Sequence, residues 1–65
     1  MKRYGEEYKV TDDAMLNIAT YMNDKYREYL HNKIAPCNNE QFIYEYCKID
    51  PDFENLLFME FGIEL

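Results

Sequence analysis

Apolar side chains recur with helical spacing over residues 11–33. With successive residues turned by about 100°, the apolar positions share an arc about 120° wide; they are Met15, Ile18, Ala19, Met22, Tyr26, Tyr29 and Leu30. Thr11 is a favourable N-cap, and Pro36 disfavours helical geometry at Ala35. The pattern therefore predicts one long amphipathic helix that ends near Lys33.

A second helix is predicted over residues 39–49. Asn38, followed three residues later by Gln41, forms the sequence pattern of a capping box. The apolar arc of this segment consists of Phe42, Ile43, Tyr46, Cys47 and Ile49. Such an arc indicates a helix with one face in the core.

A third helix is predicted over residues 51–61. Asp50 is its expected N-cap, and Pro51 takes the first helical position, where a missing N–H is tolerated. Gly62 fits the left-handed position that follows a helix, with Ile63 placed to contact Phe58 as in a Schellman motif.

The predicted fold is all-α: a small three-helix domain over residues 11–65, in which one long helix packs against two short ones. Residues 1–10 have no helical period and are treated as an N-terminal arm. The arm is either flexible or a short strand that pairs with residues 62–65.

The net charge of −6 belongs to one half of the chain. Residues 1–35 are balanced, whereas residues 36–65 contain Lys48 and seven acids: Glu40, Glu45, Asp50, Asp52, Glu54, Glu60 and Glu64. An acidic surface repels phosphate backbones and attracts basic partners. The third helix has no Lys or Arg with which to contact DNA, so we expect no direct DNA binding.

Catalytic and metal-binding patterns are weak. The imidazole and thiol ligands are His31, Cys37 and Cys47, at spacings that match no zinc motif. The acids of residues 50–54 are not followed by the glycine and glutamate of a calcium loop, and no glycine-rich phosphate loop is present. We therefore expect no enzymatic activity, no metal and no cofactor.

The third helix is apolar on nearly all sides. Phe53, Leu56, Leu57 and Phe61 share one arc, whereas Phe58 and Met59 project elsewhere. Such a helix is central to its own core or shared with a partner, and the two are compatible if one side fills the core while Phe58 and Met59 contact another chain. The candidate partner-binding residues are Phe58, Met59, Glu60 and Glu54, with Tyr44 as a possible flank.

These observations favour a small acidic protein-binding module or inhibitor that docks on a protein with a basic or mixed surface. Two alternatives stay open: an acidic mimic of nucleic acid, and a homodimer that completes an undersized core. We find no apolar run of about 18 residues and no signal peptide, which favours a cytoplasmic protein without membrane contact. The high content of Phe, Tyr, Ile, Asn and Lys suggests an AT-rich bacterial, phage or mobile-element genome.

Overall fold

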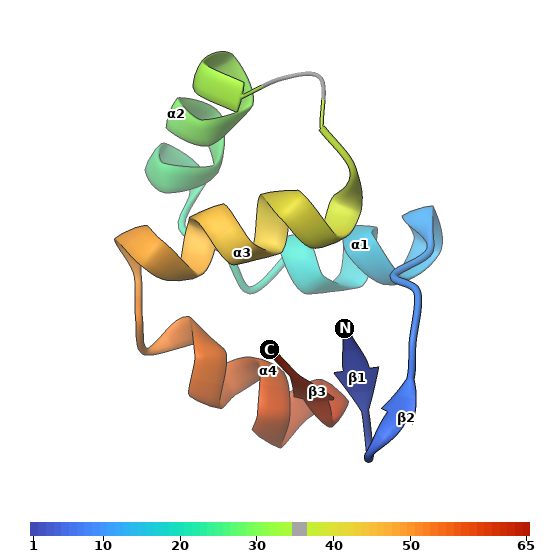
Figure 1. Ribbon diagram of the computed structural model, residues 1–65. Helices are drawn as coiled ribbons and strands as arrows, with labels where there is room; N and C mark the ends of the chain where they lie inside the picture. The colour runs from blue at the N-terminus through green and yellow to red at the C-terminus, as the bar shows by residue number, and fades with distance from the viewer. Residues whose placement is uncertain (35–36) are drawn as a thin grey trace.

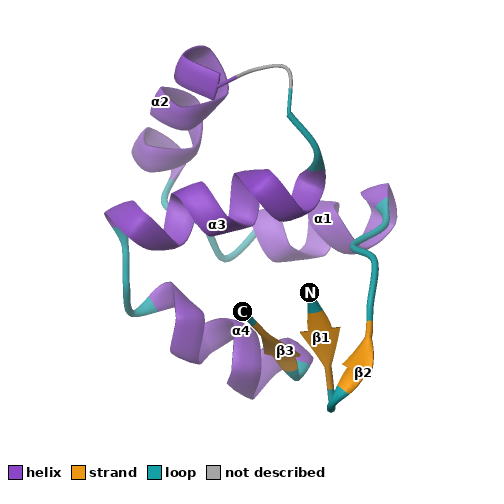
Figure 2. Cartoon of the chain, in the orientation of Figure 1, coloured by secondary structure: helices purple, strands orange, loops and turns teal. Residues whose placement is uncertain are grey.

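The computed structural model describes residues 1–34 and 37–65, and in these parts the chain forms four helices and one small sheet (Figure 1). The helices are α1 (Asp12–Ala19), α2 (Asp24–Ile34), α3 (Asn39–Ile49) and α4 (Phe53–Phe61). The strands are β1 (Lys2–Arg3), β2 (Glu6–Glu7) and β3 (Ile63–Glu64), in the antiparallel order β2-β1-β3. Figure 2 shows α3 between α2 on one side and α4 with the sheet on the other. A small, mostly helical domain is confirmed, but the predicted count of three helices is wrong.

The helix predicted over residues 11–33 is two helices. After α1, the N–H groups of residues 20–22 donate to carbonyls three residues back, at 3.0 to 3.3 Å. This tighter pattern is typical of a helix terminus. Asn23 then begins α2, because its side-chain oxygen accepts the N–H of Lys25 at 2.9 Å, as an N-cap does.

Side chains of α3 and α2 also contact the main chain at this break. The N–H of Asn23 donates to the hydroxyl of Tyr46 in α3, at 2.7 Å, instead of to a helical carbonyl. The guanidinium of Arg27 donates to the carbonyl of Ala19 at 3.1 Å, so this carbonyl at the end of α1 accepts a second hydrogen bond besides that from Met22. The break is therefore specified by tertiary contacts as well as by the local cap.

The break also changes which side chains of the first apolar arc reach the core. Ile18, Met22 and Leu30 are buried as predicted, but Tyr26 and Tyr29 are 41% and 54% exposed. Their predicted burial is wrong, because α2 starts anew after residue 23 and does not continue the angular register of α1.

The C-terminal end of α2 and the N-terminal end of α3 lie close to where the sequence predicts them. The first of these helices stops at Ile34; the predicted effect of Pro36 on Ala35 lies outside the described residues. The second is capped by Asn38, whose side-chain oxygen accepts the N–H of Gln41 at 2.7 Å. The predicted N-cap of α3 is confirmed.

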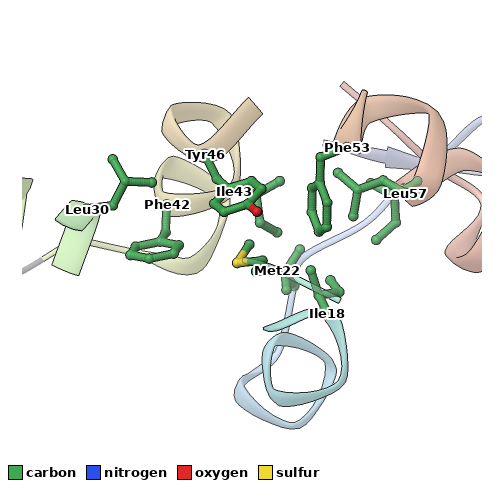
Figure 3. Packing of buried hydrophobic residues seen from close by; sticks show 10 residues of the cluster. Ile18, Met22, Leu30, Phe42, Ile43, Tyr46, Phe53 and Leu57 are labelled. Atoms are coloured by element: carbon green, nitrogen blue, oxygen red, sulfur yellow. The ribbon is translucent and has the colours of Figure 1, made fainter. Parts of the chain in front are cut away.

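Helix α3 supplies the centre of the core. Phe42, Ile43 and Tyr46 are buried, and Tyr46 is fully enclosed (Figure 3). The ring of Phe53 in α4 lies edge-on to that of Tyr46, with centroids 4.7 Å apart. Leu57, one turn further along α4, is also completely buried, so one side of α4 belongs to the core.

The ends of α4 differ in detail from the prediction. The helix begins at Phe53 and not at Pro51, and Asp50 contributes its main-chain carbonyl, which accepts the Phe53 N–H at 3.1 Å, in place of a side-chain cap. Gly62 has the predicted left-handed conformation, with φ +69°. Its N–H donates to the carbonyl of Phe58 at 2.9 Å. The same N–H also reaches the carbonyl of Leu57. The left-handed glycine at the end of the helix is confirmed, and the Schellman contact of Ile63 with Phe58 stays a prediction.

The N-terminal arm forms strands. Lys2 lies between Glu7 of β2 and Glu64 of β3, so charges of opposite sign face each other across the sheet. Tyr4 and Gly5 make the turn, with φ values of +51° and +81°, as a two-residue hairpin turn requires. The short-strand prediction is confirmed, and the flexible-arm alternative is wrong.

Candidate functional site

Helix α4 has a buried side and a solvent side. Phe53 and Leu57 are buried, whereas Phe58 is 55% and Met59 81% exposed. Glu54 and Glu60 are also exposed. We call the exposed residues Glu54, Phe58, Met59 and Glu60 the α4 face. Two large apolar side chains in an acidic frame are thus left in contact with water.

Part of the α4 face borders a groove beside β3. This α4–β3 groove has a volume of about 300 Å³, and its lining residues are Glu54, Asn55, Phe58, Ile63, Glu64 and Leu65. The structure therefore brings together two predicted site residues, Glu54 and Phe58. Met59 and Glu60 do not line the groove.

Tyr44, the predicted flank, lies on the other side of the C-terminal strand. Its ring is 41% exposed, and it borders a second hollow of about 300 Å³ with Met1, Lys2, Glu7, Glu64 and Leu65. Glu64 and Leu65 line both hollows. The end of β3 therefore lies between the hollow that Tyr44 borders and the groove that Glu54 and Phe58 border.

The acids of the C-terminal half fall into two groups. Glu40 accepts the N–H of Val10 at 2.8 Å, and Glu45 pairs with Lys48 at 3.2 Å. In contrast, no ion pair to Glu54, or to any other acid of α4, occurs in residues 1–34 and 37–65. The acids of α3 thus have partners within the chain, whereas those of α4 form no ion pair among the described residues.

The basic residues near this region do not neutralise it. Helix α4 and strand β3 contain no Lys or Arg. The Arg3 guanidinium donates to the carbonyl of Phe61 at 3.0 Å, where a cation favours the end of a helix. Lys2 faces Glu64 across the sheet. Glu54, in the first turn of α4, therefore has no basic neighbour on α4 or β3.

Sequence reasoning missed two exposed apolar residues. Leu65 is 40% exposed and borders both hollows, and Leu16 of α1 is 69% exposed. Leu16 falls outside the predicted apolar arc of its helix, which was an available signal of exposure. Leu65 follows the last helix and has no periodic context, so only the pairing of β3 reveals its place.

Three titratable groups of α3 have shifted pKa values, and that of Tyr46 is raised, chiefly by burial. The pKa of Glu40 is lowered, chiefly because its carboxylate accepts the N–H of Val10. Burial chiefly, together with the nearby acids Glu54 and Asp50, raises the pKa of Cys47 to about 11. At neutral pH Cys47 is therefore a protonated thiol and a poor nucleophile.

The candidate metal ligands are not grouped. His31 and Cys37 border a hollow of about 450 Å³ between α1, α2 and the start of α3, which Cys47 does not line. Within the described ranges, no three His, Cys, Asp or Glu side chains are arranged to hold a metal ion. None of the four helices, over the same ranges, is long and apolar enough for a membrane span.

No family model, curated protein or solved structure matches this chain. The chemistry of its own surface is therefore the basis for a functional proposal.

Proposed function

We propose that this chain is a small acidic protein-binding module that docks on a larger protein through the α4 face. The observation that supports the proposal is the exposure of Phe58 and Met59, at 55% and 81%, on a helix whose other side is fixed in the core. Exposed apolar groups with a charged rim are typical of interaction sites. A rigid helix also presents them with little loss of conformational entropy on binding.

The charge around the α4 face identifies the partner by its chemistry. Glu54 and Glu60 frame the apolar residues and have no basic neighbour on the helix. The complementary partner surface is an apolar pocket edged by Lys or Arg, since opposite potentials guide association and suppress incorrect pairing. Such a module acts by occupying a functional surface of its partner, as a non-enzymatic inhibitor in the cytoplasm of a bacterium or phage-infected cell would.

The nucleic-acid mimic is the weaker proposal. A mimic needs acids spaced along one exposed surface, but Glu40 and Glu45 have hydrogen-bonded partners within the chain. Glu64 faces Lys2 across the sheet. Only some of the acids in the C-terminal half are therefore free to imitate phosphates.

The decisive experiment compares two exposed apolar sites in partner capture from the native host. The tagged chain is used as wild type, as Phe58→Ser with Met59→Ser, and as Leu16→Ser, the last a control with 69% exposure on another helix. We expect the double variant to lose at least about tenfold in affinity, as anchor residues do, and the control to retain capture.

Circular dichroism and urea unfolding check that all three proteins keep the same fold. Equal capture by all three would contradict docking through α4. Light scattering over a dilution series tests self-association, and a dimer disrupted by the double variant would favour the homodimer instead.

A further inference from the structure

A larger hollow lies on the α2 side of α3, away from the α4 face. This α2–α3 hollow, which His31 and Cys37 border, has a volume of about 450 Å³. Figure 2 shows α3 between α2 and α4, and none of the residues of the α4 face lines the hollow. Its volume falls within the range of small-molecule sites, about 300–1,000 Å³. The hollow is therefore a candidate ligand site that the proposed function does not use.

Part of the lining of this hollow is apolar. Met15 of α1 and Cys37, which precedes α3, are half-buried. Phe42 also lines the hollow and is 9% exposed, whereas Ile43 and Tyr46 on the same helix are completely enclosed. An apolar group in the hollow would remove from water the surface that these side chains leave uncovered, which favours binding.

The polar part of the lining presents hydrogen-bond donors. Arg27 and His31 lie one turn apart on α2, and both border the hollow. The side chain of Arg27 is 42% exposed and donates to the carbonyl of Ala19 and to Asp24, an 88% exposed acid outside the lining. A guanidinium has more N–H groups than these two bonds use, so Arg27 retains donors for a ligand.

His31 and Asn38 add donors that the described chain does not use. Neither the imidazole of His31 nor the side-chain NH₂ of Asn38 has a hydrogen-bond partner among residues 1–34 and 37–65. The oxygen of Asn38 accepts the N–H of Gln41, which leaves its NH₂ group for another acceptor. An imidazole keeps an N–H in either protonation state. A ligand group with acceptor oxygens therefore finds donors on three lining residues.

The charge of the lining favours an anion. Over the described ranges the lining includes no Asp or Glu, although the whole chain has a net charge of −6. Asp12 and Glu40 border an adjoining hollow that shares residues 37–39, but each of them accepts a hydrogen bond from another residue of the chain. An anion in the α2–α3 hollow therefore meets donors and one guanidinium, and no carboxylate of the lining.

We propose that the α2–α3 hollow binds a small organic acid, whose carboxylate pairs with Arg27 and His31 while its apolar body covers Met15 and Phe42. A guanidinium pairs with a carboxylate in a planar arrangement, through charge-assisted hydrogen bonds that are about twice as strong as neutral ones. Arg27 is the one permanent cation of the described lining, so it matches a singly charged ligand. A phosphate group, with a charge of about −1.5 to −2, leaves an excess of negative charge in a chain that is already acidic.

An NMR titration of the labelled chain tests the ligand class with three probes: naphthylacetate, the neutral naphthylacetamide and inorganic phosphate. We expect naphthylacetate to shift the amide signals of Met15, His31 and Phe42. It should bind at least about tenfold more tightly than naphthylacetamide, the factor for the charge-assisted bonds, and more tightly than phosphate, which has no apolar body. Equal affinity for naphthylacetate and its amide, tighter binding of phosphate, or no shift with millimolar naphthylacetate overturns the proposal.

Three variants of α2 locate the carboxylate. Arg27→Gln removes the cation that lines the hollow, and Lys33→Gln makes the same change on a cation outside the lining. We expect naphthylacetate to bind about tenfold more weakly to Arg27→Gln and equally well to Lys33→Gln. Because Arg27 also contacts Ala19, circular dichroism checks the fold of this variant. His31→Ala should weaken binding about threefold, the factor for one neutral hydrogen bond, and decides the test if Arg27→Gln does not fold. Equal losses for Arg27→Gln and Lys33→Gln, or unchanged affinity of His31→Ala, contradict the site.

This site is independent of the α4 face. The double variant Phe58→Ser with Met59→Ser should bind naphthylacetate as the wild type does, and Arg27→Gln should still capture the host partner. Loss of naphthylacetate binding in the double variant would place the acid on α4 and overturn the proposal. Loss of partner capture alone would leave the α2–α3 hollow as its binding site.

Discussion

Helices α3 and α4 are both rich in large apolar residues, but they use them differently. Helix α3 turns Phe42, Ile43 and Tyr46 inward, and its three buried side chains form the middle of the core. Helix α4 buries two side chains and leaves Phe58 and Met59 exposed. Apolar composition therefore does not distinguish a helix that buries its large apolar side chains from one that leaves some of them exposed; the division between inner and outer sides does.

The acids of the two helices show the same contrast. On α3, Glu40 binds the main chain before α1 and Glu45 binds Lys48. On α4, Glu54 and Glu60 form no such contact among the described residues. We infer that substitutions in α3 change stability and that substitutions on the α4 face change binding.

The largest expected effect is that of Ile43→Ala. Ile43 is completely buried, so the shortened side chain leaves a cavity and lowers the free energy of unfolding by about 2–4 kcal/mol. The matched change on the other helix, Met59→Ala, removes an 81% exposed side chain and should shift it by less than about 0.5 kcal/mol. Urea unfolding followed by circular dichroism measures both.

Similar losses for the two variants would contradict the division between α3 and α4. A large loss for Met59→Ala, in particular, would mean that Met59 stabilises the fold in solution, either within one molecule or in a dimer. Repeating the unfolding at several protein concentrations separates these two cases, since only dimer stability depends on concentration.

A smaller effect is expected for Tyr46→Phe, which keeps the buried ring and removes the hydroxyl. That hydroxyl accepts the N–H of Asn23 at 2.7 Å. Loss of the bond should lower the free energy of unfolding by about 1 kcal/mol and speed amide exchange at Asn23. Hydrogen exchange followed by NMR measures the second effect directly.

Tyr44→Phe is the matched control, because its ring lies on the same helix but is 41% exposed. It should leave the Asn23 exchange rate unchanged. If Tyr46→Phe also leaves that rate unchanged, the Asn23 cap and the Arg27 contact maintain the break between α1 and α2 without the Tyr46 hydroxyl.

Most parts of the fold that the sequence predicted correctly depend on local chemistry; the exception is the pairing of the N-terminal arm with residues 62–65. Thr11 accepts the N–H of Ala14 at 3.2 Å, Asn38 caps α3 and Gly62 ends α4. Each feature involves residues within a few positions of one another. The break before α2 was missed because its second determinant, the hydroxyl of Tyr46, is 23 residues away from Asn23 along the chain.

The candidate site follows the same rule. Phe58 and Met59 were singled out because they project away from the apolar arc of their own helix, which a sequence pattern reveals. The α4–β3 groove was missed because it requires the pairing register of β1 with β3. The sequence predicted that the two ends of the chain pair, but the register of that pairing has no local signal.

The smallest expected effect concerns the acid of α3 that serves the fold. The pKa of Glu40 is lowered, chiefly by the hydrogen bond from Val10. The folded state therefore binds fewer protons than the unfolded state as the carboxyl titrates. Its contribution to stability is present above the unfolded pKa and is lost as pH falls through the folded pKa.

Glu40→Gln should therefore reduce stability at neutral pH by less than about 1 kcal/mol, since the amide oxygen still accepts a hydrogen bond, and should weaken the loss of stability in acid. Glu54→Gln, on the α4 face, makes the same chemical change without a bond to the main chain and should retain the acid dependence of the wild type. Urea midpoints from neutral pH down to the range where carboxyl groups titrate provide the measurement. If Glu54→Gln weakens the acid dependence and Glu40→Gln does not, the acids of α4 stabilise the fold, and their assignment to a partner fails.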